Sequence, residues 1–363
     1  MDQKFSMFPL DKIATAWRGL LDGHFDESLF PFEVFDGVFI EDVSSLMSPD
    51  EFDYCKQELG TNLIKHLESI KYALIHRYPS FEIDSTTGEM KFEAELAGAS
   101  RDLIQQIVAC LRLIRPFVQY PQFLGGSIGE GGRLYHIHFD HPIPFLSSLS
   151  SQILMAIRTQ DAQQLKSIFP LFRTAMEGNY WKFRMAVDMF QSGYFQQTHW
   201  KVRFFMWTAA LEALVTSHSS SQHRGSVVAK ARIKELLGPN SLIYHPGDLS
   251  TYENDPKLTV NDVIDEIYCL RNHIAHGDKV PDYYFLTKGR DGLNGPINKI
   301  ETLSEAVGSI ARQSLLAILN KNLLTHFQDA ATSEAYFGSL GLTKSNLDAQ
   351  LKASGAKHFV CPT

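Results

Sequence analysis

The sequence predicts a mainly α-helical protein, with an N-terminal α+β domain followed by a C-terminal helical domain. Apolar residues alternate with polar ones over 81–96 and 133–139, which is typical of strands. This alternation stops near residue 150, and apolar residues then recur at three- and four-residue spacing. We therefore expect an α+β domain over 1–150, a helical domain over 151–330 and a C-terminal tail over 331–363.

Turn and cap residues set the expected elements of the N-terminal domain. Pro49, preceded by a serine and followed by two acidic residues, is typical of a helix start. A turn-rich centre separates the two halves of FEIDSTTGEMKFEAEL, which favours a hairpin. The predicted elements are a helix over 48–78, a hairpin over 81–96, a helix from Ser100 to Leu113, a glycine-rich loop over 125–132 and a strand over 133–139.

Helical periodicity dominates the C-terminal domain. The expected helices cover 151–168, 174–191, 200–217, 225–237, 259–276 and 300–327. The loops between the last three, 238–258 and 277–299, are rich in Pro, Gly, Asp and Asn. Together these patterns predict a bundle of helices rather than a second sheet.

Composition limits the partners and the location of the chain. Its 363 residues are 44% hydrophobic and 21% charged, with a net charge of −7, so any nucleic-acid binding needs a local basic cluster. Four widely spaced cysteines, without a CxxC pair, predict reduced thiols and a cytoplasmic protein. No apolar run is long enough for a membrane span, so we expect no membrane partner.

One residue breaks the pattern of the helix predicted over 259–276. Thr259 and Asp262 resemble a capping box, and Gly277 is a plausible left-handed stop. At about 100° per residue, Arg271 lies near the middle of the apolar stripe, where we expect burial. A buried guanidinium adds little to fold stability, which favours a functional role; the alternative is an arginine whose head reaches water.

The expected partner of Arg271 is Glu212. The segment RFFMWTAALEALVTS in the helix 200–217 carries Glu212 as its one charge between Phe204 and Ser217, and so apolar a helix belongs in the core. Pairing would leave neither charge alone in an apolar environment. The alternative places Glu212 at the margin of the helix, facing solvent.

Two histidines occupy the last turn of the same helix, His273 and His276. A helix C-terminus favours the protonated imidazole, which suits general acid–base chemistry near neutral pH. The five-residue step from Arg271 to His276 turns about 140°, so their side chains diverge on one helix unless its end unwinds. A second copy of the chain is another way to bring them together.

The residues Arg271-Asn272-His273-Ile274-Ala275-His276 match the R-x4-6-H motif of the HEPN superfamily. FFMWTAALEALV followed by AKARIKELLG resembles the second and third helices of Apea-like HEPN domains, and the likeness covers about 170–330. The resemblance implies a helical bundle that forms a homodimer and joins two motifs in one cleft, often a metal-independent endoribonuclease. It implies no cofactor and no metal.

The resemblance also implies a role for each residue of the motif. Arg271 would stabilise the pentacovalent phosphate, His276 would transfer a proton, Asn272 would orient the phosphate or the histidine, and Glu212 would fix Arg271. RNA would be cleaved to a 2′,3′-cyclic phosphate and a 5′-hydroxyl, in a defence or toxin system. The N-terminal domain would sense a signal or restrain the activity. A regulatory protein is a possible partner. The candidates for a local RNA track are Arg203, Arg224, Lys230, Arg232 and Lys234.

Two other functions remain open from the sequence. A non-catalytic HEPN module would bind RNA, a nucleotide or a partner protein. A metal-dependent enzyme would be centred on His136, His138 and His141, with Asp140 nearby, although histidines on a surface strand are the simpler interpretation. GGSIGEGG lacks the Gly-Lys-Ser/Thr ending of a phosphate-binding loop.

Overall fold

The computed structural model divides into two compact units, Met1–Pro170 and Leu171–Thr363. Residues 140–156, where we expected the domain boundary, lie outside the described residues. The structure describes residues 3–9, 26–44, 72–79, 81–83, 86, 90–115, 124–128, 134–139, 157–195, 199–217, 225–243, 258–285, 287–288 and 297–354.

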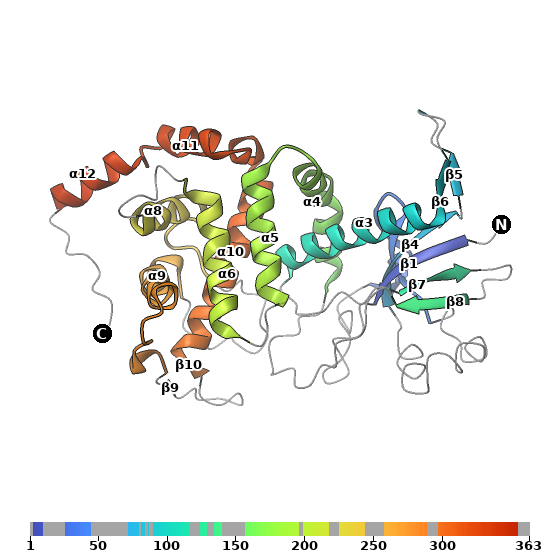
Figure 1. Ribbon diagram of the computed structural model, residues 1–363, viewed down its shortest axis with the longest axis horizontal. Helices are drawn as coiled ribbons and strands as arrows, with labels where there is room; N and C mark the ends of the chain where they lie inside the picture. The colour runs from blue at the N-terminus through green and yellow to red at the C-terminus, as the bar shows by residue number, and fades with distance from the viewer. Residues whose placement is uncertain are drawn as a thin grey trace. The chain divides into compact units, whose positions relative to one another are not determined.

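The first unit contains a six-stranded antiparallel sheet with a long helix packed on two of its strands (Figure 1). The sheet order is β2-β3-β4-β1-β7-β8, and Met7 lies opposite both Ile75 and Leu124. The strands are β1 (Gln3–Pro9), β2 (Phe32–Phe35), β3 (Val38–Asp42), β4 (Tyr72–Pro79), β7 (Leu124–Ile128) and β8 (Leu134–Phe139), with a separate hairpin of β5 (Phe81–Ile83) and β6 (Met90–Phe92).

The long helix is α3 (Glu93–Ile114), which packs on β1 and β4. Ile104, Ile107 and Leu111 follow the three- and four-residue spacing of one helix face, and all three are fully buried. This face and the apolar side chains of β1 and β4 form the core of the first unit.

The α+β character of the N-terminal half is confirmed for the described residues, as are the hairpin and the strand at 134–139. Three details were wrong. The helix starts at Glu93, where two acidic residues favour a helix start, and Ser100 lies inside it with its hydroxyl 2.9 Å from His76 Nδ1. Residues 72–78, expected to end a helix, form β4 because their apolar side chains are buried in the sheet, and 125–128, expected as a loop, belong to β7.

The second unit is helical, as the periodicity predicted. The helices are α5 (Trp181–Phe195), α6 (Trp200–Val215), α8 (Gly225–Leu237), α9 (Val260–His276) and α10 (Lys299–Asn320), and α4 (Thr159–Glu177) spans the division between the units. Short elements are η2 (Glu27–Leu29) in the first unit, and η4 (Asp282–Phe285), β9 (Thr287–Lys288), β10 (Ile297–Asn298) and η5 (Leu324–Phe327) in the second. The starts of α4 and α5 lie seven or eight residues after the expected ones, whereas α6, α8 and α9 match within two residues.

Helix α6 is central to the second unit, since it contacts α5, α8, α9 and α10 (Figure 1). Its Trp207 lies where two glycines allow close approach of the neighbouring helices. A Cβ atom at Gly193 of α5 would overlap the indole ring, and one at Gly308 of α10 would lie 2.9 Å from it. The indole Nε1 donates a 3.1 Å hydrogen bond to the carbonyl of Phe190. These contacts fix the helix that carries Glu212.

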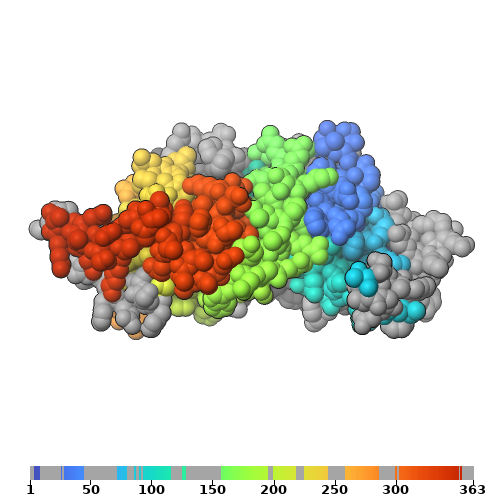
Figure 2. Space-filling model, turned by 90° about the horizontal axis from the view of Figure 1, so that it is seen from above, coloured from blue at the N-terminus to red at the C-terminus, as the bar shows by residue number. Residues whose placement is uncertain are grey.

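The stretch expected as a tail contains two helices, α11 (Ala330–Ser339) and α12 (Lys344–Ser354). Asp329 caps α11 by accepting a 2.8 Å hydrogen bond from the amide of Thr332. Phe337 is fully buried, and α12 lies against α8, as the red and yellow surfaces in Figure 2 show. These helices pack as part of the second unit because α11 contributes apolar side chains to its core.

Candidate functional site

Helix α9 ends where the sequence predicted, and its two ends carry the expected caps. Asp262 accepts a 2.7 Å hydrogen bond from the Thr259 amide, and Gly277 adopts the left-handed conformation with φ of 70°. The amide of Asp278 then bonds the carbonyl of His273 at 2.9 Å. The cap thus places the Arg271–His276 segment in the last two turns of a regular helix.

Arg271 and Glu212 form an ion pair between α9 and α6. Nη2 of Arg271 donates a 2.8 Å hydrogen bond to Oε2 of Glu212, and each side chain is 26% exposed. Arg271 is therefore less buried than its place in the stripe predicted. The fully buried part of the stripe ends at Leu270, and Ile274, one turn later on the helix, is half-buried. The guanidinium is held from one side and still reaches solvent.

The other two motif residues with a predicted role are Asn272 and His276, and their surroundings differ. Oδ1 of Asn272 lies 3.5 Å from Nη1 of Arg271, at the outer limit of a hydrogen bond. His276 is exposed, and within the described residues its ring has no hydrogen-bond partner. Its imidazole is accessible to a ligand, whereas the guanidinium of Arg271 is anchored.

His273 differs from His276 in its surroundings. Both of its ring nitrogens are buried without a hydrogen-bond partner among the described residues, and the ring meets that of Tyr284 edge-on at 6.4 Å. Despite its place in the last turn, His273 is suited to packing rather than proton transfer.

Sequence reasoning missed Tyr268, which lies one helical turn before Arg271. Its side chain is buried, and its hydroxyl has no hydrogen-bond partner in the described part of the chain. Burial raises the pKa of Tyr268 well above its usual value, and the nearby Glu212 carboxylate raises it further, while Arg271 opposes both. The available signal was the position of a tyrosine three residues before Arg271 on the apolar stripe.

The four described candidates for the RNA track are buried or bonded to neighbouring side chains. Arg203 and Arg232 are buried, and Arg224 lies outside the described residues. Lys230 pairs with Asp265, and Lys234 donates a 2.7 Å hydrogen bond to Asn261. Helical spacing alone could not show that these cations serve contacts within the unit.

The structure does not describe the side chains of the histidine-centred alternative. His136 and His138 belong to β8 as predicted, but their side chains, together with Asp140 and His141, lie outside the described residues. Within the described part of the chain, no group of three or more His, Cys, Asp or Glu side chains could hold a metal ion.

Of the two described cysteines, one is free, as expected, and the other is not. Cys110 is free and buried, and burial raises its pKa well above the usual value of a thiol. Cys269 of α9 is disulfide-bonded. Disulfides are uncommon in a reducing cytosol, so this bond weighs against the cytoplasmic location expected from the sequence.

Comparisons with known proteins assign the chain to no family. No family model, no curated protein and no solved structure matches it. Among the described residues, no helix has both the length and the apolar character needed to cross a bilayer. The side chains around Arg271 are therefore the main indication of function.

Proposed function

We propose that the chain is a metal-independent endoribonuclease of the HEPN type, acting in defence or as a toxin. The observation that carries this proposal is the ion pair of Arg271 with Glu212, five residues before the end of a helix whose last residue is the exposed His276. A guanidinium that is held by a carboxylate, on a side chain that is 26% exposed, is suited to stabilise phosphate charge. An exposed imidazole is suited to move a proton.

In the proposed reaction the ribose 2′-oxygen attacks the adjacent phosphorus and the bond to the 5′-oxygen breaks. His276 accepts the proton of the 2′-hydroxyl or donates one to the leaving 5′-oxygen, and Arg271 stabilises the charge on the phosphate oxygens. Asn272 orients the phosphate or the imidazole, and Glu212 holds Arg271 in place. The products are a 2′,3′-cyclic phosphate and a 5′-hydroxyl.

We propose further that two copies of the helical unit complete the site. On a regular helix Arg271 and His276 project about 140° apart, and α9 stays helical through His276. A two-fold axis would place the arginine of one copy next to the histidine of the other. In this scheme the N-terminal unit senses a signal or restrains the nuclease.

The experiment is an incubation of purified protein with mixed single-stranded RNA in the presence of EDTA. We expect cleavage with cyclic phosphate ends, and no cleavage of DNA of the same sequence, which lacks the 2′-hydroxyl. Loss of cleavage in EDTA, or equal cleavage of DNA, would contradict the proposed chemistry.

A second candidate function is a HEPN module that binds a partner without cleaving RNA. The observation that favours it is the loss of the basic track, because Arg203 and Arg232 are buried and Lys230 is ion-paired. A chain with net charge −7 then attracts RNA weakly. The same assay separates the two functions, since the module would leave RNA intact at every protein concentration.

A further inference from the structure

A buried arginine holds the end of the helix that carries Glu212. Arg232 of α8 is fully buried, and its Nη1 donates a 2.7 Å hydrogen bond to the carbonyl of Val215, the last residue of α6. Its Nε donates a 3.1 Å bond to the carbonyl of Leu342, which follows α11. Arg232 therefore connects α6 to the C-terminal helices.

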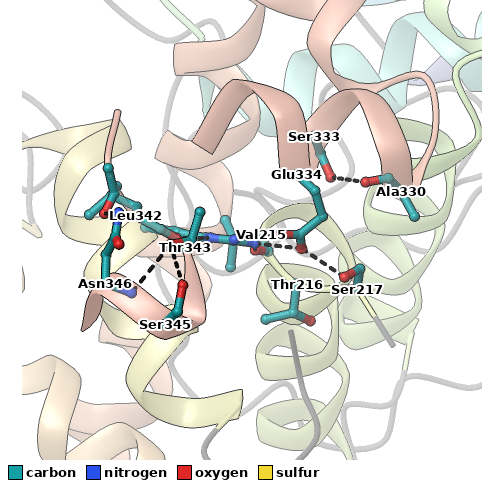
Figure 3. Close-up of polar contacts among 12 residues, drawn as sticks. Val215, Thr216, Ser217, Ala330, Ser333, Glu334, Leu342, Thr343, Ser345 and Asn346 are labelled. Carbon is teal, nitrogen blue, oxygen red and sulfur yellow. Dashed lines mark hydrogen bonds and ion pairs between the residues drawn. The ribbon is translucent and has the colours of Figure 1, made fainter. Parts of the chain in front are cut away.

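Glu334 of α11 holds Arg232 in a bidentate ion pair. Oε1 of Glu334 accepts from Nη1 of Arg232 at 2.8 Å, and Oε2 accepts from Nη2 at 2.6 Å. Ser217 donates a 2.7 Å bond to Oε1, and Figure 3 shows Glu334 lying between α11 and the residues that end α6. The guanidinium also lies 4.7 Å from the ring centre of Phe337.

A second buried cation, Lys182, donates a hydrogen bond to the carbonyl that follows that of Val215. Nζ of Lys182 donates a 2.6 Å hydrogen bond to the carbonyl of Thr216, and the side chain is almost wholly buried. The last carbonyls of a helix have no partner within it, and positive charge at that end is favourable. Lys182 and Arg232 thus satisfy two successive carbonyls at the end of α6.

The last turn of α6, whose end Lys182 and Arg232 hold, includes the backbone carbonyl of Glu212. The amide of Thr216 donates to the carbonyl of Glu212 at 2.9 Å, and the Thr216 hydroxyl donates to the same oxygen at 2.7 Å. A shift of Val215 and Thr216 would therefore move the backbone of Glu212. Oε2 of Glu212 lies 2.8 Å from Nη2 of Arg271, so a movement of Glu212 that lengthens or misaligns this hydrogen bond would weaken it.

We propose that Arg232 and Glu334 are positioning residues for the candidate site. Helix α11 holds Arg232, Arg232 holds the last turn of α6, and that turn fixes Glu212 against Arg271. Fold stability is a poor reason for this pair, because apolar residues of similar volume commonly replace a buried ion pair without loss. Only the expected effect of these residues on RNA cleavage rests on the proposed function; their effect on the position of Glu212 does not.

The test compares Glu334→Gln with Glu177→Gln, a control that removes one partner of the surface pair with Arg173. We expect amide hydrogen exchange in a peptide covering 212–217 to be about tenfold faster in Glu334→Gln and unchanged in the control. The coupling between Glu212 and Arg271, measured by a double-mutant cycle, should fall by about half in the Glu334→Gln background. RNA cleavage should fall about tenfold in kcat with little change in KM.

A second variant covers the case in which Glu334→Gln does not fold. The double replacement Arg232→Met with Glu334→Leu removes both charges together and should fold, while it still releases the carbonyl of Val215. Unchanged exchange over 212–217 in the variant that folds overturns the proposal, whatever the RNA assay gives. Faster exchange with reduced coupling supports it, even if the unmodified protein cleaves no RNA, a result that would overturn the nuclease alone.

Discussion

Nη2 of Arg271 lies 2.8 Å from Oε2 of Glu212, joining two helices whose paired residues are 59 positions apart in the chain. The pairing was expected because each charge stood in an otherwise apolar stretch. Burial of Arg271 was expected too, but its side chain, like that of Glu212, is 26% exposed. This exposure lowers the energy we assign to the pair and leaves the guanidinium open to a ligand.

The pair should be thermodynamically coupled. We expect Glu212→Gln and Arg271→Met to lose about 1–2 kcal/mol of unfolding free energy each, and the double variant to lose about 1 kcal/mol less than their sum. Urea unfolding of the four proteins measures this. The exposed pair of Arg173 and Glu177 provides the control, with a coupling of about 0.5 kcal/mol or less.

Close packing around Trp207 predicts a strong effect of a single methyl group. Gly193→Ala should destabilise the protein by about 2 kcal/mol or more, because its Cβ would overlap the indole ring. Gly98→Ala in α3 is the matched control: beyond its own helix backbone, no described residue comes within 4 Å of the added Cβ, so the better helix propensity of Ala should stabilise by up to about 1 kcal/mol. Equal effects of the two substitutions in thermal unfolding would contradict this packing.

The sequence predicted the features that depend on local pattern. Periodicity placed α6, α8 and α9 within two residues, and cap chemistry placed Thr259 and Gly277 at the ends of α9. The isolation of Glu212 and Arg271 in apolar stretches was enough to pair them, because an unpaired charge in a core is costly.

Features that depend on tertiary contacts were missed. Arg232 looked like a surface cation, but its partners Glu334 and Leu342 are more than 100 residues away. The strand at 72–78 looked helical because its runs of apolar residues fit either period until the sheet selects one. Burial of the hydroxyl of Tyr268 likewise depends on how α9 packs, which spacing does not reveal.

Lys182 should make stability depend on pH above neutrality. Burial lowers the pKa of Lys182 from 10.5 to about 8; Arg232 lowers it too, whereas Glu334 and Asp329 raise it. Between these two pKa values Lys182 holds its proton in the unfolded chain but not in the folded chain, so the free energy of unfolding rises with pH in this range. The destabilisation due to Lys182 is therefore complete below pH 8 and falls as the pH rises toward 10.5.

The shift from 10.5 to about 8 corresponds to about 3 kcal/mol. Lys182→Met should therefore remove a rise in unfolding free energy that the unmodified protein shows between pH 7.5 and 9.5. Lys279→Met is the matched control, because the Lys279 side chain is 83% exposed. The same pH dependence in all three proteins would show that Lys182 is not desolvated.

Complementation tests whether two copies share one site. We expect a dimer at micromolar concentration by light scattering, and little activity from Arg271→Ala or His276→Ala alone. After co-expression of the two variants, a heterodimer can join the intact arginine of one chain to the intact histidine of the other, which should restore about half of one dimer's activity per heterodimer. A monomer in solution, or no recovery in the isolated heterodimer, would count against a shared site.

The most direct measurement of the central claim is RNA cleavage by purified His276→Ala in EDTA, beside the unmodified protein and His273→Ala. We predict that His276→Ala and Arg271→Ala each reduce cleavage at least ~100-fold, with His276→Ala folded normally because its side chain is exposed. His273→Ala should retain most of the activity, since its ring nitrogens are buried away from solvent. Full activity of His276→Ala, or no cleavage by the unmodified dimer, would contradict the account.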